Sequence, residues 1–257
     1  MGELRARIID LENQYYDEFS VRDDNGLVVR FKDDEISDMY SHNFTLIRSE
    51  LSEEDLKLFI ENEKTRRRQE GHDFLLIKFE YKVAEEHLPK ADKVRFSDIE
   101  YYRLSPAAVD RMKEREDIEV IKLSELLLED ARELDEICAE SGEALDFTRR
   151  RFDRRSKVYL KEGGPDNYLA LLNWEAVGSC DYYSDGRNCM LEDFIVDPAY
   201  RGQGIGTSLL KTLAKLAFAK GNDFVFLSTD GNETAREMYI KLGFEKIWTA
   251  SEALYKF

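Results

Sequence analysis

One stretch decides how this chain is interpreted: Val196-Asp197-Pro198-Ala199-Tyr200-Arg201-Gly202-Gln203-Gly204-Ile205-Gly206. Residues 189–196, which are mostly apolar, lead into it and predict a strand. After it, Ile205, Leu209 and Leu213 recur at the spacing of one helical face. A helix N-terminus has unpaired N–H groups and a partial positive charge, and glycines let a phosphate approach that backbone closely. The stretch therefore predicts a pyrophosphate cradle between a strand and a helix.

Two common phosphate-binding loops do not fit this stretch. A P-loop closes with Gly-Lys-Ser or Gly-Lys-Thr, whereas Gly206 is followed by Thr207 and Ser208. A dinucleotide-binding fingerprint needs a third glycine three residues after the second, and Thr207 stands there when Gly204 is the second. The pattern Arg201-x-x-Gly204-x-Gly206 instead resembles motif A of the GCN5-related N-acetyltransferases (GNAT), Arg/Gln-x-x-Gly-x-Gly/Ala. The alternative is an ordinary strand–turn–helix connection whose glycines serve tight packing.

The order of elements in the second half agrees with this resemblance. Hydrophobic periodicity predicts a strand at 118–123, helices at 124–140 and 147–161, and strands at 168–174, 176–183 and 188–196. It then predicts the cradle helix ending at residue 220, a strand at 224–228, a helix at 233–242, and strands at 244–247 and 253–257. The resemblance implies an α/β (α+β) fold, in which helices flank a mixed, mostly antiparallel central sheet (the acyl-CoA N-acyltransferase fold).

The first half resembles a shortened acetyltransferase core. We expect a helix at 4–17, strands at 27–31 and 42–47, a helix at 52–69 with Ser52 as its N-cap, a strand at 74–79, and a hairpin of 93–96 with 99–102. No glycine cradle precedes the Ser52 helix. The division is therefore residues 1–116, a degenerate GNAT-like domain that cannot hold a pyrophosphate, and residues 117–257, the acetyltransferase domain. An unrelated, smaller α+β cap is the alternative for the first domain.

Composition limits the partners. The formal net charge of −16 argues against nucleic-acid binding and against a basic membrane-docking surface. It is compatible with a cationic substrate, and also with solubility alone. The three cysteines, Cys138, Cys180 and Cys189, are odd in number and form no CxxC pair, so we expect neither disulfides nor a metal site. Since no signal-peptide pattern or 18-residue apolar run is present, we expect a cytoplasmic protein.

Two arginine-rich runs could suggest an anionic partner. The first, Arg66-Arg67-Arg68, is interleaved with glutamates and predicts a solvated helix face of mixed charge. The second, residues 149–155, falls in a helix that borders the acceptor site in the family. Surface ion pairs and contact with an anionic part of a substrate both remain open for it.

The resemblance also implies how acetyl-CoA, the expected co-substrate, would bind. Clustered backbone N–H donors would hold the pyrophosphate, which places the contact at Arg201, Gly202, Gln203, Gly204, Ile205, Gly206 and Thr207. In the family the pantetheine arm bonds to the open edge of the fourth strand, which corresponds here to Phe194, Ile195 and Val196. A backbone N–H near Val196 could polarise the thioester carbonyl.

A later motif supplies further candidates. The run Asn232-x-x-Ala235-x-x-x-Tyr239-x-Lys241-x-Gly243-Phe244 resembles the family's Asn-x-x-Ala-x-x-x-Tyr-x-x-x-Gly-Phe. Asn232 at a helix start could cap the helix or reach the cofactor. Tyr239 follows about two turns later on the same face, and its phenol suits protonation of the departing CoA thiolate. The alternative is a core aromatic and a plain N-cap.

A base must deprotonate the substrate ammonium before the amine can attack. Family members often use a carboxylate of the fourth strand, where Glu192 and Asp193 stand here. Strand alternation predicts that Glu192 shares a face with Phe194 and Val196, so only one of the two carboxylates would face the acceptor. We favour Glu192, with Asp193 or solvent as alternatives. Asp181 and Tyr183 are secondary candidates for contact with the acceptor.

These residues predict an acetyl-CoA-dependent N-acetyltransferase acting by direct transfer in a ternary complex. The expected acceptor is a small primary amine, with a homo-oligomer left open. The alternatives are a non-catalytic acyl-CoA-binding or regulatory module and an enzyme that acetylates a protein N-terminus or lysine.

Overall fold

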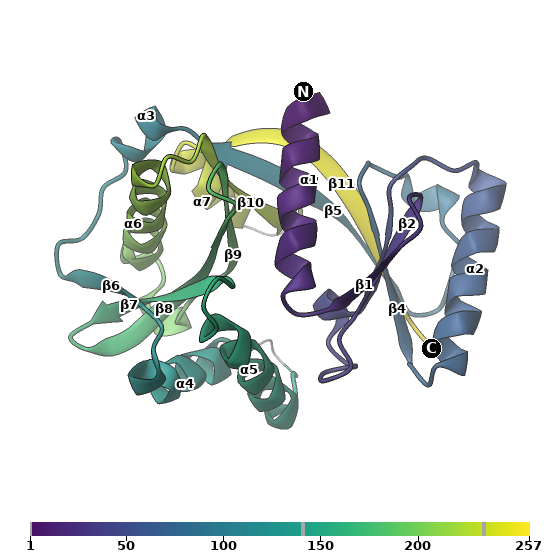
Figure 1. Ribbon diagram of the computed structural model, residues 1–257, viewed down its shortest axis with the longest axis horizontal. Helices are drawn as coiled ribbons and strands as arrows, with labels where there is room; N and C mark the ends of the chain where they lie inside the picture. Colours follow the sequence, from purple (N-terminus) through teal and green to yellow (C-terminus); the bar gives the residue numbers. More distant parts are fainter. Residues whose placement is uncertain (1, 140–141, 233–234) are drawn as a thin grey trace. The chain divides into compact units, whose positions relative to one another are not determined.

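The computed structural model describes residues 2–139, 142–232 and 235–257 (Figure 1). It forms two compact units. The first comprises Met1–Glu18, Tyr102–Leu227 and Glu237–Lys246, and the second comprises Phe19–Tyr101, Ser228–Arg236 and Ile247–Phe257. The expected division between residues 116 and 117 does not coincide with these units. Helix α1 (Gly2–Asp17), from the start of the chain, belongs with most of the second half.

The first unit contains the candidate site. Besides α1, the elements that lie wholly or mostly in it are α3 (Pro106–Val109), β6 (Ile118–Lys122), η3 (Glu125–Leu127), α4 (Leu128–Cys138), α5 (Leu145–Tyr159), β7 (Asp166–Leu172), β8 (Glu175–Ser184), β9 (Asn188–Val196), η4 (Pro198–Tyr200), α6 (Ile205–Ala219), β10 (Phe224–Asp230) and α7 (Ala235–Lys241). Its strands follow the order β10-β9-β8-β7-β6. Strand β10 is parallel to β9, and the other neighbours are antiparallel. The mixed, mostly antiparallel sheet with flanking helices confirms the expected fold class.

Helix α6 packs directly on this sheet. It covers one face, while α4 and α5 cover the other (Figure 1). Its buried apolar side chains are Ile205, Leu209, Leu210, Leu213, Ala214 and Ala217, the stripe expected from the sequence. In β8, a Cβ on Gly178 would lie 3.4 Å from Cγ2 of Ile205 and 3.3 Å from the carbonyl oxygen of Ile195. Glycine at this position therefore permits the close approach of α6 to the sheet.

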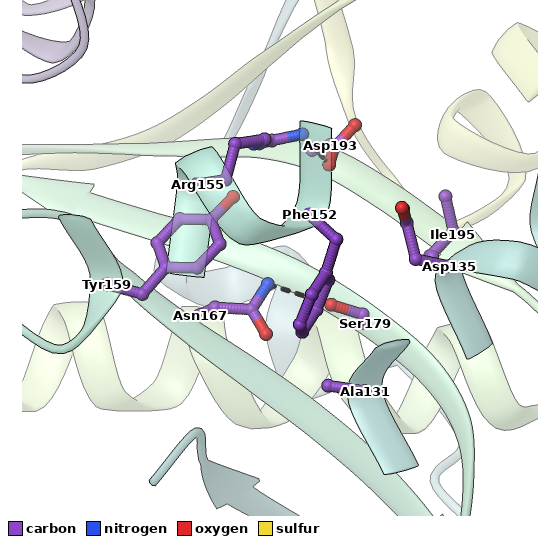
Figure 2. A pocket seen from close by; sticks show the side chains of 9 residues that line it. All are labelled: Ala131, Asp135, Phe152, Arg155, Tyr159, Asn167, Ser179, Asp193 and Ile195. Carbon is purple, nitrogen blue, oxygen red and sulfur yellow. Dashed lines mark hydrogen bonds and ion pairs between the residues drawn. The ribbon is translucent and has the colours of Figure 1, made fainter. Parts of the chain in front are cut away.

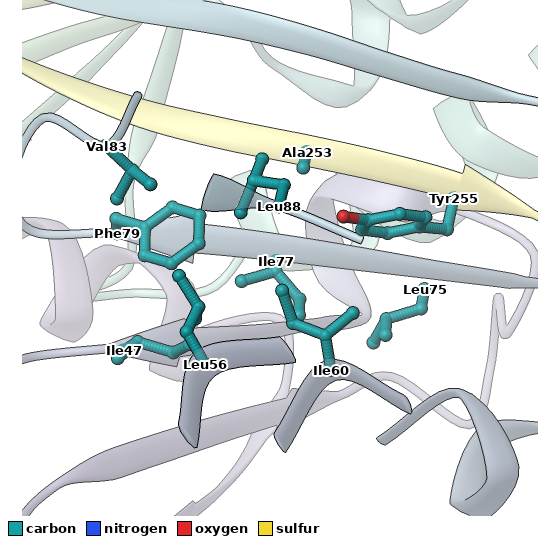
Figure 3. Packing of buried hydrophobic residues seen from close by; sticks show 10 residues of the cluster. All are labelled: Ile47, Leu56, Ile60, Leu75, Ile77, Phe79, Val83, Leu88, Ala253 and Tyr255. Carbon is teal, nitrogen blue, oxygen red and sulfur yellow. The ribbon is translucent and has the colours of Figure 1, made fainter. Parts of the chain in front are cut away.

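The second unit is a smaller sheet with one long helix. Its elements are β1 (Val21–Asp24), β2 (Val28–Lys32), η1 (Tyr40–His42), β3 (Phe44–Ile47), α2 (Glu53–Gln69), β4 (Phe74–Phe79), η2 (Glu85–His87), and most of β5 (Val94–Leu104) and β11 (Glu245–Lys256). The order β1-β2-β3-β4-β11 contains one parallel pair, β3 with β4. Figure 3 shows Leu56 and Ile60 of α2 packed on Ile77 and Tyr255 of the sheet. Ser52 is the N-cap, as expected, and accepts a hydrogen bond from the Asp55 backbone.

Three expectations about elements differ from the structure, and one strand of the structure was not expected. The hairpin of 93–96 and 99–102 is one strand, β5, and the strands 244–247 and 253–257 are one strand, β11. The helix expected at 124–140 begins as the 3₁₀ turn η3, and Ser124 makes no side-chain cap bond. Strand β1 was not expected. The start expected for the last helix, at residues 233–234, lies outside the described residues.

Buried polar partners explain the two strand errors. In β5, the Ser97 hydroxyl donates to Asp230 at 2.7 Å. In β11, the Ser251 hydroxyl donates to the Val83 carbonyl at 3.4 Å and accepts from the Val83 N–H at 3.0 Å. A polar residue within an apolar run indicates a turn when its hydrogen-bond partners are unknown. Here the partners come from distant parts of the chain, so both strands continue.

Candidate active site

The cradle is a tight turn that leads from β9 into α6. Gly202 and Gly204 have φ angles of 73° and 85°, in the left-handed region that favours glycine. Gly204 is the N-cap of α6, and its carbonyl accepts the bond from the Ser208 N–H at 3.0 Å. The backbone N–H groups of the first turn precede this bond and point out of the helix end. The turn has the geometry of an anion-binding site.

The side chains of this turn also hold the turn itself. The Nε of Arg201 donates to the carbonyl of Val196 at 3.1 Å. The Nε2 of Gln203 donates to the carbonyl of Ala199 at 3.0 Å. Asp197 starts η4 by accepting a bond from the Ala199 backbone at 2.8 Å. The side chains of Arg201 and Gln203 therefore stabilise the loop by hydrogen bonds to its backbone. Their expected contact with a cofactor stays a prediction.

Arg115 reaches this turn and was missed in the sequence. Its Nη1 donates to the carbonyl of Gln203 at 3.1 Å, and a Cβ on Gly204 would lie 3.4 Å from its Cδ. Its own N–H donates to the Ser208 hydroxyl at 2.8 Å. The expected domain boundary lay directly after it, between residues 116 and 117. The neighbouring Glu114 forms salt bridges with two lysines of α6, Lys211 and Lys215. Its charge was therefore the sequence signal for a contact between this segment and α6.

Gly206 allows α6 to pack on β9. A Cβ at this position would lie 2.6 Å from Cζ of Phe194 and 3.4 Å from Cγ2 of Val196. The first distance is too short for a packed contact, so a side chain at this position would force the Phe194 ring to shift. The side chains of Phe194 and Val196 therefore lie on the α6 face of the sheet.

A β-bulge in β9 overturns the expected alternation. In the register with β8, Ile195 pairs with Ser179 but Glu192 pairs with Asp181, so Cys180 opposes both Asp193 and Phe194. Asp193 has a φ of 48°. Directly opposed residues share a face, which puts Glu192 with Ile195 rather than with Phe194 and Val196. The prediction that Glu192 shares a face with Phe194 and Val196 was wrong, because the extra residue shifts the alternation by one.

The expectation that strand alternation places the two carboxylates on opposite faces of the sheet was also wrong. Asp193 and Ile195 both line a small cavity on the α4–α5 face (Figure 2), the face that Glu192 shares by register. The cavity measures about 20 Å³, room for a water molecule rather than a substrate. Its lining is Ala131, Asp135, Phe152, Arg155, Tyr159, Asn167, Ser179, Asp193 and Ile195.

Asp181 is not placed to touch an acceptor. Its side chain is fully buried and accepts bonds from Tyr15, Arg155, Tyr159 and Asn167 at 2.7–2.8 Å. Burial raises the pKa of this carboxyl, while Arg155 and the bond from Asn167 oppose the shift. The pKa of Arg155 itself is raised, because the neighbouring carboxylates outweigh its desolvation. The expected contact between Asp181 and an acceptor is contradicted, since four donors of the protein surround it.

The other secondary candidate, Tyr183, is also occupied by the protein. Its hydroxyl donates to Glu18 at 3.3 Å, and burial raises its pKa to about 12.

Tyr239 lies in an aromatic cluster. Its side chain is buried on α7, with ring centroids 5.6 Å from Phe244, 6.3 Å from Tyr102 and 6.4 Å from Phe194. Asn232 belongs to the other unit, where its N–H donates to Asp230 at 2.9 Å. The ring of Tyr239 contacts that of Phe194 in β9. The expected contact of Asn232 with the cofactor stays a prediction.

The thiols of the first unit are poor nucleophiles. Burial raises the pKa of Cys138 to about 11, and it raises the pKa values of Cys180 and Cys189 further. A thiol with so high a pKa is protonated at neutral pH. A covalent acetyl-cysteine intermediate is therefore disfavoured. In the described ranges, no group of three or more His, Cys, Asp or Glu residues could hold a metal ion. No helix in the same ranges is long and apolar enough to cross a bilayer.

The comparisons with known proteins agree with this geometry. Residues 127–244 match a family model described as the acetyltransferase (GNAT) family. Over 73 residues the chain is 44% identical to thialysine N-epsilon-acetyltransferase of Mus musculus, a match that spans 28% of this chain and 42% of that protein. The chain therefore spans less than half the length of this curated relative.

Solved structures are similar over nearly the whole chain. A functionally unknown conserved protein from Staphylococcus epidermidis ATCC 12228 has a TM-score of 0.80 at 17% identity, covering 96% of this chain and 97% of that one. A GCN5-related N-acetyltransferase from Kribbella flavida has a TM-score of 0.67 at 15% identity, with 98% and 95% covered. At such identities the likeness concerns the fold alone.

Proposed function

We propose that this chain is an acetyltransferase of the GNAT family and moves an acetyl group from acetyl-CoA to a primary amine by direct transfer in a ternary complex. The observation that carries the proposal is the course of β9. In the described residues, its parallel pairing with β10 covers Asn188, Cys189 and Met190. The strand then continues through the bulge and leads into the Gly204 turn. An extended amide-containing arm fits such a strand edge, with its pyrophosphate at the start of α6.

In this mechanism the amine nitrogen attacks the carbonyl carbon of the thioester. A backbone N–H near Val196 stabilises the oxyanion of the tetrahedral intermediate. Glu192, which is half-buried on the α4–α5 face, or water held by it, takes the proton from the ammonium. The carbon–sulfur bond then breaks, and Tyr239 protonates the CoA thiolate. The roles of Glu192, Val196 and Tyr239 belong to the proposal.

Two observations support direct transfer to a small primary amine. The raised pKa values of the three thiols disfavour a two-step route through an acetyl-cysteine. The curated relative is named for acetylation of an ε-nitrogen, which is a primary amine.

The experiment is release of CoA thiol from acetyl-CoA across a panel of acceptors. The panel contains amino acids, polyamines, aminoglycosides, and short peptides with a free N-terminus or an internal lysine. We expect release with one class of small amine, and an acetylated amine in equal amount by mass spectrometry. Acetyl-CoA binding by calorimetry without release would support a non-catalytic acyl-CoA-binding module. Release with peptides alone would support a protein acetyltransferase.

A further inference from the structure

Arg155 connects two carboxylates that belong to neighbouring strands. It projects from α5 and is only 7% exposed. Its Nη2 lies 2.8 Å from Oδ2 of Asp181 in β8, and its Nη1 forms an ion pair with Asp193 in β9 (Figure 2). The guanidinium is planar and rigid, so fixing one end orients the other.

The Asp181 end is fixed by the core. Besides Arg155, the Asp181 carboxylate accepts bonds from the hydroxyls of Tyr15 at 2.7 Å and Tyr159 at 2.8 Å, and from Nδ2 of Asn167 at 2.8 Å. These donors come from α1, α5 and β7. A fully buried carboxylate with this many donors has little freedom to move. Arg155 is therefore anchored on its inner side.

The Asp193 end is the part of β9 that needs support. Its φ of 48° lies in the left-handed region, which is uncommon for a residue with a side chain although Asp tolerates it better than most residues, and it occurs at the bulge, where Asp193 and Phe194 together oppose Cys180. Backbone conformations of this kind persist when the surrounding structure holds them. Arg155 reaches Asp193 from the core.

We propose that Arg155, anchored through Asp181 and Tyr15, is a positioning residue that holds the β9 bulge in shape and so places the backbone of β9 for the reaction. The inference rests on the proposed function of this site. It gives helix α1, which lies outside the family match at residues 127–244, a part in the active unit. Arg155 acts on the reaction through Asp193 and does not itself touch the acetyl group.

The chain offers a matched control one turn away. Arg151 on α5 is also largely buried and pairs with two carboxylates, Asp135 and Glu143, neither of which is in β9. Arg155→Met and Arg151→Met remove the same charge and nearly the same volume. Arg155→Lys keeps the charge but has only one donor group, so it can serve one carboxylate well. Asp193→Asn breaks the ion pair alone and keeps a residue that tolerates positive φ.

The first readout needs no activity. Hydrogen–deuterium exchange of the peptide covering residues 188–196 is measured without ligand in the full chain. Arg155→Met should speed exchange around the bulge about tenfold, while Arg151→Met should leave that peptide unchanged. If Arg155→Met does not fold, Asp193→Asn takes its place with the same expectation. Equal exchange of this peptide in the wild type, in Arg155→Met and in Asp193→Asn would overturn the inference, whatever the enzyme acetylates.

The second readout separates positioning from binding. With the acceptor found by the panel, Arg155→Met should lower kcat about tenfold or more, with the Kd of acetyl-CoA changed less than about threefold, and Arg155→Lys should restore part of kcat. An Arg155 and Asp193 double-mutant cycle should be non-additive. A wild type that neither binds nor cleaves acetyl-CoA refutes the proposed function. An active wild type with an unchanged kcat in Arg155→Met refutes only the positioning role.

Discussion

At the scale of single residues, glycines and one bulge residue determine the shape of the site. Gly204 supplies a positive φ at the start of α6, and Gly206 leaves room for the ring of Phe194. Asp193 takes up a similar conformation without being glycine, and Arg155 reaches it from the core. The sequence identified both glycines through the motif. The sequence did not predict the bulge, because the expected alternation of side chains assumes a regular strand. Nothing in residues 191–195 indicates that the strand contains an extra residue.

The cradle can be tested at Gly204 with two substitutions of equal shape. Asp and Asn both tolerate a positive φ, and the flexible Arg115 side chain beside the new Cβ can move. If the turn holds a pyrophosphate, the Gly204→Asp carboxylate repels it, whereas the Gly204→Asn amide does not. We expect acetyl-CoA to bind at least about tenfold more weakly to Gly204→Asp than to Gly204→Asn, measured by calorimetry. Equal affinities would place the pyrophosphate elsewhere.

Tyr239 can be tested against a second tyrosine of the same cluster. Tyr239→Phe keeps the buried ring and removes the hydroxyl that we assign to protonation of CoA. We expect kcat to fall about 100-fold, with acetyl-CoA affinity retained, in single-turnover experiments that isolate chemistry. Tyr102→Phe, which alters the ring 6.3 Å away, should leave kcat within about threefold. A fully active Tyr239→Phe enzyme would exclude this role and leave Tyr239 a core aromatic.

At the scale of elements, charged residues expected on a solvated helix face are partly buried. Glu63 of α2 has a side-chain exposure of 6% and pairs with Arg30 of β2 at 2.7 Å and Arg66 at 2.8 Å. Thr45 of β3 also donates to it. The expected mixed-charge face of α2 was thus correct in composition but wrong about solvent, because the sequence does not show that β2 and β3 lie beneath the helix.

This ion-pair cluster predicts a pH dependence of stability. Burial alone would raise the pKa of Glu63, but the hydrogen bonds of Arg30 and Arg66 outweigh it and lower the pKa. A lowered folded-state pKa stabilises the protein above the unfolded value of about 4.3, and this stabilisation is lost as the pH falls below it. Glu63→Gln should cost about 2 kcal/mol of unfolding free energy at pH 7, and the difference from wild type should shrink towards pH 3.

The control for this prediction is on the same helix. Glu61 is exposed, and among the described residues it pairs with the buried Lys64 at 2.7 Å. Glu61→Gln keeps an oxygen that can accept a hydrogen bond from Lys64, so it should lower the unfolding free energy at pH 7 by less than half as much as Glu63→Gln does, measured by urea denaturation. A Glu63→Gln difference that is the same at pH 7 and pH 3 would contradict the assignment of the ion pairs.

At the scale of the whole molecule, the compact units do not follow the order of the chain. Helix α1 belongs to the first unit, where Tyr15 donates to the buried Asp181 and Arg7 pairs with Asp223 at 2.6 Å. Strands β5, β10 and β11 each contribute residues to both units. A division at residue 117 therefore removes part of the unit that contains the cradle.

The isolated fragment 117–257 tests this organisation. Without α1, the Asp181 carboxylate loses a donor and part of its cover, and leaving a buried charge under-satisfied costs several kcal/mol. We expect the fragment to melt without a cooperative transition in circular dichroism and to lose acetyl-CoA affinity. A full chain carrying Tyr15→Phe should fold and melt only a few degrees lower. A fragment that folds and binds like the full chain would show that α1 is dispensable.

Local pattern in the sequence determined most of the elements and the cradle motif, because helical and strand periodicity and glycine spacing are properties of neighbouring residues. Two examples are Ser52 and Gly204, which the sequence placed at the starts of helices α2 and α6, where the structure also has them. The fold class followed from the resemblance of that motif and of the element order to the GNAT family. Only the tertiary structure decided that β5 and β11 run unbroken, that β9 carries a bulge, and that α1 reaches Asp181. Each depends on hydrogen-bond partners at least 133 residues apart in the chain or on strand register, and local sequence carries no record of either.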